Sequence, residues 1–126
     1  MKNIVVSIPN SLLSGGITLY LKQDSDFCIF HEEQLGRFVN TCCAVCAEVV
    51  LIEVRAYSPH TIEEWLTRIK EMKKKLPHCK SAFIVEENAN PQLAEQVRQL
   101  RSDRLIDAFF YGAVSGEYVT AVVASL

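Results

Sequence analysis

Short apolar segments alternate with segments of helical periodicity along the whole chain. Five runs have the pattern of strands: Asn3 to Ile8, Asp26 to Phe30, Glu48 to Val54, Lys80 to Val85 and Leu105 to Tyr111. In the third run four branched apolar residues, Val49 to Ile52, follow one another. Such a run is typical of a strand buried on both faces, so it is predicted to be the central strand.

Five helices are expected between and after these strands. They are Ser11 to Lys22, a segment from about Glu32 to Val45, one between Thr61 and Pro77, one that begins at Asn90-Pro91, and Gly116 to Leu126. The clearest start is the capping box Thr61-Ile62-Glu63-Glu64. Strands that alternate with helices favour a flavodoxin-like, doubly wound parallel sheet with strand order 2-1-3-4-5 and helices on both faces. Residues 1–126 have the length of one such domain.

Several segments, in their order and spacing, resemble the receiver (CheY-like) domain of bacterial response regulators. Glu48 to Val54 resembles the phosphoacceptor strand, Asn90 to Glu95 the start of the fourth helix, and Phe110 to Ser115 the end of the fifth strand. The likeness covers the whole chain. It implies a role in two-component signalling, where a kinase transfers a phosphoryl group to an aspartate beside a divalent cation.

The positions that carry this chemistry in the family have changed. Ile8 and Pro9 match the acidic pair that holds the cation, and neither has a side-chain oxygen. Glu53 stands at the phosphoacceptor, Glu86 at the hydroxyl position and Gly112 at the lysine position. Phosphoryl transfer depends on these electrostatic elements. We therefore expect a pseudo-receiver that is not an enzyme and needs no metal or other cofactor; the alternative is an atypical phosphoacceptor at Glu53.

Phe109 matches the aromatic residue whose ring switches position in the family. With Glu86 and Gly112 at the hydroxyl and lysine positions, no phosphoryl group is expected to draw this ring into a second position. We expect one fixed, inward orientation of this ring.

The last helix predicts an interaction surface. One side carries Val119, Val122, Val123 and Leu126, the side expected to pack on the sheet. Its other side carries Tyr118, Ala121, Ala124 and Ser125, an unusually uncharged surface. Arg98 and Arg101 of the fourth helix are expected beside it. This face is predicted to form a homodimer or to bind a protein partner, unless a further C-terminal segment covers it.

Composition narrows the remaining possibilities. With 49% hydrophobic and 22% charged residues and a net charge of -2, the chain has no bulk attraction for nucleic acid or membranes. It contains no recognition helix for DNA, although it could be the receiver part of a longer DNA-binding regulator. The absence of a long apolar run or a signal peptide points to the cytoplasm.

Cysteines form a separate candidate site. Cys43-Ala44-Val45-Cys46 has the C-x-x-C spacing of redox enzymes, but these residues fall late in a helix, where the helix dipole disfavours thiolates. Cys42, Cys43, Cys46, Cys79, His31 and His78 contain only one close pair of cysteines, a poor match to a zinc site. Reduced, mostly buried thiols are expected.

Overall fold

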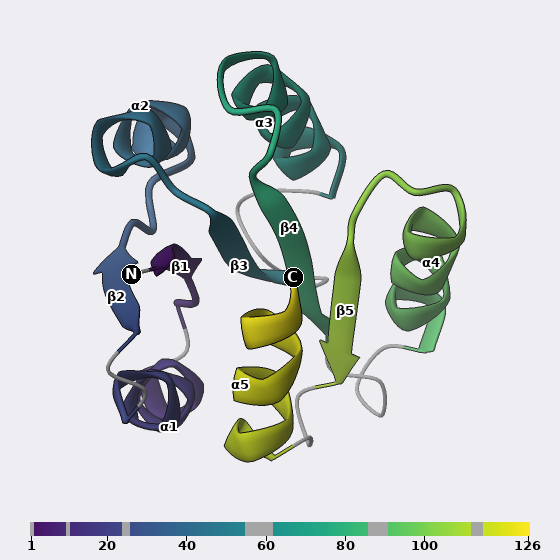
Figure 1. The fold of residues 1–126 in the computed structure, drawn as a ribbon. Coiled ribbons are helices and arrows are strands. Elements are labelled where there is room, and N and C mark those ends of the chain that lie inside the picture. Colours follow the sequence, from purple (N-terminus) through teal and green to yellow (C-terminus); the bar gives the residue numbers. More distant parts are fainter. Residues whose placement is uncertain (1, 10, 24–25, 55–61, 86–90, 112–114) are drawn as a thin grey trace.

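The computed structural model describes residues 2–9, 11–23, 26–54, 62–85, 91–111 and 115–126, and for 11–14 the backbone alone. Five strands form one parallel sheet: β1 (Lys2–Ser7), β2 (Phe27–His31), β3 (Val49–Val54), β4 (Lys80–Val85) and β5 (Ala108–Tyr111). Their order is β2-β1-β3-β4-β5 (Figure 1). The predicted topology is therefore confirmed, with β3 at the centre and β2 and β5 at the edges.

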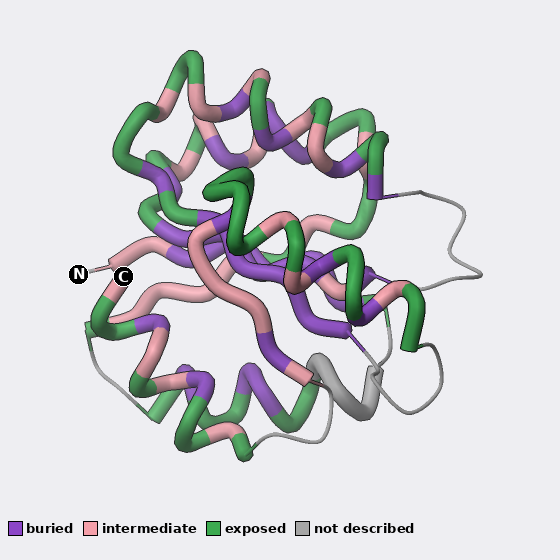
Figure 2. The backbone as a smooth tube through the Cα atoms, turned by 90° about the vertical axis from the view of Figure 1, so that its right-hand side faces the viewer, coloured by how far each residue is buried: buried purple, intermediate pink, exposed green. Residues whose placement is uncertain are grey.

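Five helices cover the two faces of the sheet. They are α1 (Ser11–Lys22), α2 (Leu35–Val45), α3 (Ile62–Lys75), α4 (Pro91–Ser102) and α5 (Gly116–Ser125). Helices α2, α3 and α4 lie on one face, and α1 and α5 lie side by side on the other (Figure 1). Figure 2 shows that the central strands are largely buried, whereas buried and exposed residues alternate along the described parts of the helices.

Side chains of β3 enter both halves of the core, because neighbouring residues of a strand point to opposite faces. Val50 and Ile52 join the apolar cluster beneath α2, α3 and α4. Val49 and Leu51 join the cluster beneath α1 and α5. Because both faces of β3 are buried, the sequence has an uninterrupted run of branched apolar residues from Val49 to Ile52.

The prediction that the fifth strand begins at Leu105 was wrong. Arg104 adopts a left-handed conformation with φ of 61°, and the Leu105 amide donates a hydrogen bond to the Leu100 carbonyl at 2.9 Å. These residues thus end α4 in a Schellman-type turn, and the strand begins only at Ala108. No glycine marks the turn, so the apolar pair after Arg104 gave a false strand signal.

The two ends of the described chain meet. The Lys2 ammonium donates hydrogen bonds to the carbonyls of Val123, Ala124 and Leu126 at 3.1 to 3.2 Å. A cation at this position satisfies carbonyls that the last turn of a helix leaves free. Lys2 therefore anchors the end of α5 to β1.

No helix in the described part of the chain is both long and apolar enough to cross a membrane. The predicted helix starts at Thr61 and Asn90 lie outside the described residues.

Candidate functional site

The two residues that follow β1, Ile8 and Pro9, have hydrocarbon side chains, at the position where a cation-binding receiver would have carboxylates. Ile8 is 1% exposed and belongs to the same apolar cluster as Ile17 and Leu21 of α1. Pro9 is exposed and has no side-chain oxygen. This end of β1 therefore contributes packing and no carboxylate ligand for a cation.

Glu53 is half-buried in β3, where it pairs in register with Ile84. The neighbouring strand β1 ends at Ser7, whose hydroxyl is buried and has no hydrogen-bond partner among the described residues. Glu86 and Gly112 lie outside the described residues. Across the described ranges, no three His, Cys, Asp or Glu side chains are placed to hold a metal ion together.

An open groove of about 800 Å³ runs along the edge strand β5. It is lined by residues of α4, β5, α5 and the segments next to them: Arg101, Asp107, Ala108, Phe109, Phe110, Tyr111, Ser115, Tyr118, Val122 and Leu126. Most of these side chains are apolar or aromatic. The groove lies beside a strand whose outer edge pairs with no other described strand.

The predicted residues of α5 fall into two groups. Tyr118 lines the groove, is 55% exposed, and packs edge to face on Phe110 with 6.0 Å between ring centroids. Ala121, Ala124 and Ser125 are exposed but do not line the groove. The helix is positioned by Ser115, whose hydroxyl accepts a hydrogen bond from the Tyr118 amide at 3.2 Å.

Val122 and Leu126 are only half-buried and line the groove, whereas Val119 and Val123 are buried in the core. The apolar side of α5 is thus divided between core and groove. Periodicity alone could not make this division, because it depends on where the sheet ends.

The two arginines of α4 differ in their surroundings. Arg98 donates to the Glu95 carboxylate at 2.6 and 3.0 Å and to the Tyr111 hydroxyl at 2.6 Å. These hydrogen bonds, with that of Glu95 the stronger, raise the pKa of the Arg98 guanidinium further above its usual range. Arg101 is exposed and lines the groove. Arg101 is thus the arginine that presents a charge at the groove.

Phe109 is half-buried and packs against the core cluster beneath α4. Its ring meets that of Tyr111 edge to face, with 5.7 Å between centroids. Because it also lines the groove, this aromatic residue connects the core to the surface beside β5.

The cysteines form no disulfide in this structure. All five are free thiols. Burial, followed by the charges of neighbouring groups, raises the pKa of Cys42 to about 12, and burial raises the pKa of Cys79 to about 12. Cys46 adopts a left-handed conformation with φ of 54° at the end of α2, where its amide helps to end the helix. Its position at the carboxyl end of a helix agrees with the predicted location of the C-x-x-C segment.

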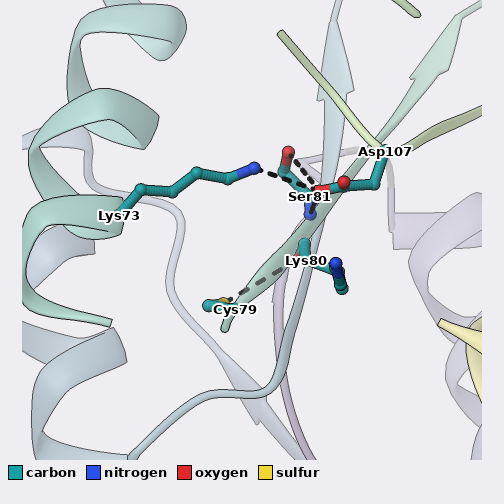
Figure 3. A network of polar contacts seen from close by, with 5 residues as sticks. All are labelled: Lys73, Cys79, Lys80, Ser81 and Asp107. Carbon is teal, nitrogen blue, oxygen red and sulfur yellow. Dashed lines mark hydrogen bonds and ion pairs between the residues drawn. The ribbon is translucent and has the colours of Figure 1, made fainter. Parts of the chain in front are cut away.

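One polar network was not predicted from the sequence. The Asp107 carboxylate accepts hydrogen bonds from the Ser81 amide at 2.9 Å and from the Lys73 ammonium at 3.2 Å (Figure 3). Partial burial raises the pKa of Asp107, but these hydrogen bonds and the charges of Lys73 and Lys80 lower it to below its usual range. The partners come from α3, β4 and the segment before β5, so no local sequence pattern signals the network.

Solved structures share this architecture. A response regulator receiver domain from Methanospirillum hungatei superimposes with a TM-score of 0.76 and 11% identity, over 99% of this chain and 92% of the other. A LuxR-family DNA-binding response regulator from Staphylococcus aureus superimposes with a TM-score of 0.74 and 15% identity, over 99% of this chain and 98% of the other.

A third structure belongs to a family of redox sensors in the streptococci described as evolved from two-component response regulators. It gives a TM-score of 0.78 and 13% identity over 99% of this chain and 50% of the other. The sequence matches no known protein-family model, and no curated protein is significantly similar to it. The superpositions on solved structures show that the chain has the CheY-like receiver fold.

Proposed function

We propose that the protein is a regulatory module that works without phosphorylation and acts through contacts with other protein chains. Burial of Ile8 in the core at the end of β1 is the observation that carries the first part of this proposal. A divalent cation prefers several oxygen ligands, and this position supplies none. Without a cation, the charge that develops during phosphoryl transfer has lost its main stabilising partner.

The rival function is an atypical phosphoacceptor at Glu53. Incubation of the full chain with acetyl phosphate and magnesium, followed by intact mass measurement, separates the two. A receiver domain that is known to be phosphorylated serves as the positive control. We expect no added phosphate on this protein. A stoichiometric adduct that disappears in Glu53→Ala would establish the rival function.

The groove beside β5 supports the second part of the proposal. Exposed aromatic residues at a concave, largely apolar surface are typical of protein interfaces. Tyr118 and Arg101, both types enriched in binding hot spots, stand at this groove. The face formed by α4, β5 and α5 is thus the proposed contact surface, either with a second copy of the chain or with a protein partner.

Light scattering at tens to hundreds of micromolar tests self-association. Ala121 is exposed on α5 and Ala44 is exposed on α2, on the other side of the sheet. We expect a dimer that becomes monomeric in Ala121→Arg and persists in the matched control Ala44→Arg. If the wild-type protein and both variants have the mass of a monomer, self-association is excluded and only the partner-binding form of the proposal survives. Equal dissociation of both variants would place the contact elsewhere.

We further propose that the module serves transcriptional or two-component regulation in a bacterial cell. The fold is shared with a DNA-binding response regulator and with redox sensors derived from such regulators. The described surface beside β5 carries few charges, so DNA contacts are assigned to another domain or chain.

A further inference from the structure

A second groove, of about 440 Å³, lies between α3 and the turn that follows α4. Its described lining contains three apolar residues, Leu66, Ile69 and Leu105, and four cationic residues, Lys70, Lys73, Lys74 and Arg104. Leu105 is 39% exposed, which is unusual for a large aliphatic side chain in this molecule. The groove therefore combines an accessible hydrophobic surface with a concentration of positive charge.

Three of these four cations have no ion-pair partner among the described residues. Lys73 is bound to Asp107, as Figure 3 shows. Glu71, the acidic residue on this part of α3, pairs with Arg68 at 3.1 Å and not with Lys70 or Lys74. The chain as a whole carries a net charge of -2, whereas the charged residues that line this groove are all positive. The groove consequently carries uncompensated positive charge, from Lys70, Lys74 and Arg104, beside the apolar side chains of its lining.

Arg104 is held in place by the backbone. Its left-handed conformation, at φ of 61°, is uncommon for a residue with a side chain. The Arg104 amide bonds to the Arg101 carbonyl at 3.1 Å, and the Leu105 amide bonds to the Leu100 carbonyl at 2.9 Å. One turn thus sets the backbone positions of a cationic and an apolar residue that line the same groove.

We propose that this groove binds an acidic amphipathic segment of a partner protein, with leucine-like side chains on Leu66 and Leu105 and carboxylates beside Lys70, Lys74 and Arg104. An amphipathic helix laid in an apolar groove is a common mode of peptide recognition. Among the described residues, the lining contains no aromatic side chain on which bases could stack, so nucleic acid fits less well. The groove is concave, so a flat membrane surface also fits less well. This inference concerns a different surface from the groove beside β5 and does not depend on the proposed function.

Selection of random 12-residue peptides displayed on phage, with the full chain immobilised, tests the chemistry of the partner. We expect enrichment of Asp and Glu together with Leu, Ile or Met at helical spacing. The same selection on Lys70→Glu/Lys74→Glu should not enrich these peptides. Enrichment of basic or uncharged peptides, or no enrichment, would overturn the proposal.

The best selected peptide is then synthesised, and its affinity is measured by fluorescence anisotropy. We expect at least tenfold weaker binding to Lys70→Glu/Lys74→Glu and to Leu105→Ser. Lys22→Glu/Arg37→Glu is the matched control, since it makes the same charge change at exposed positions of α1 and α2. Equal weakening in the control would show that bulk charge alone is responsible and would refute the groove.

Arg104→Gly provides a variant that should not impair folding, because glycine readily adopts the left-handed conformation found there. It removes one cation and should also weaken the peptide. Amide chemical shifts should change at Leu66, Lys70 and Leu105 when the peptide is added. Shift changes confined to β5 and α5, or tighter binding of a short RNA or of phosphatidylserine vesicles with the same sensitivity to the variants, would overturn the proposal. Ala121→Arg should leave peptide affinity unchanged, so this test is independent of the dimer test.

Discussion

Replacement of Asp107 by alanine should destabilise the fold at the point where β4 and β5 begin to pair. Asp107 and Ser81 bond reciprocally, since the Asp107 amide donates to the Ser81 carbonyl at 2.9 Å and the Ser81 amide donates to the Asp107 carboxylate at 2.9 Å. Ser81 is fully buried. In Asp107→Ala the Ser81 amide would lose its acceptor, and Lys73 would lose its carboxylate partner.

The size of the effect follows from these contacts. A hydrogen bond to a charged acceptor contributes about 1.5 to 3 kcal/mol, and a buried donor left without a partner costs about 1 to 3 kcal/mol. The Lys73 pair is about a third exposed on the lysine side, so it adds at most about 1 kcal/mol. We expect Asp107→Ala to lower the free energy of unfolding by about 3 kcal/mol, measured by urea denaturation at pH 7. Asp103→Ala is the control, because Asp103 is exposed and its carboxylate bonds only Gln99 among the described contacts.

The pH dependence gives a second readout. The pKa of folded Asp107 lies below the 3.8 of an unperturbed aspartate, so its ionised form is favoured by folding. This contribution is fully present above the pKa of the unfolded chain and is lost as the pH falls through the folded pKa. The difference in stability between wild type and Asp107→Asn should therefore stay constant from pH 7 to about 5 and shrink below about pH 4. A difference that vanishes near pH 6, or an Asp107→Ala variant as stable as Asp103→Ala, would refute this reasoning.

Three further predictions concern packing, thiol reactivity and cations. In Gly116→Ala the new methyl group would overlap the Tyr20 ring, so stability should fall by about 1 to 2 kcal/mol, whereas Gly15→Ala has open space and should gain about 0.5 to 1 kcal/mol, both by urea denaturation. Cys46 is exposed and should react with a thiol reagent within minutes, whereas Cys42, with its raised pKa of about 12, should react only on unfolding; similar rates for both would be inconsistent with the structure. The melting temperature should not respond to millimolar magnesium, and a rise that a monovalent salt does not reproduce would reveal a cation site.

The strands and their order were predictable because each follows from a local pattern and a general topological rule. The branched run of β3 specified the centre of the sheet, and the alternation of strands and helices then specified the parallel order. The end of α4 was not predictable, because Arg104 adopts a conformation that usually requires glycine. Since arginine rarely adopts this conformation, no residue at the turn signals the end of the helix in the sequence.

The site was predictable only in part, for a related reason. The uncharged surface of α5 is visible in the sequence, and the structure places Tyr118 of this surface at the groove beside β5. The structure adds β5 itself, whose side chains line the groove at the edge of the sheet. Asp107 and its partners are separated by 26 and 34 residues in the chain, so only the fold brings them together.

Asp107 also connects the two grooves, and this connection decides how they can be studied separately. Asp107 lines the groove beside β5, whereas its partner Lys73 lines the second groove, between α3 and the turn that follows α4. A substitution at Asp107 or Lys73 removes an interaction between residues of the two grooves. A resulting change in binding could therefore not be assigned to one of these surfaces. Among the described interactions, this network makes no contact with Lys70, Lys74 or Arg104 of the second groove, or with Tyr118 of the groove beside β5. Side-chain variants at those positions therefore isolate each groove. A ligand that affects both surfaces has two described routes between them, the Lys73–Asp107 pair and the backbone hydrogen bond from Arg104 to Arg101.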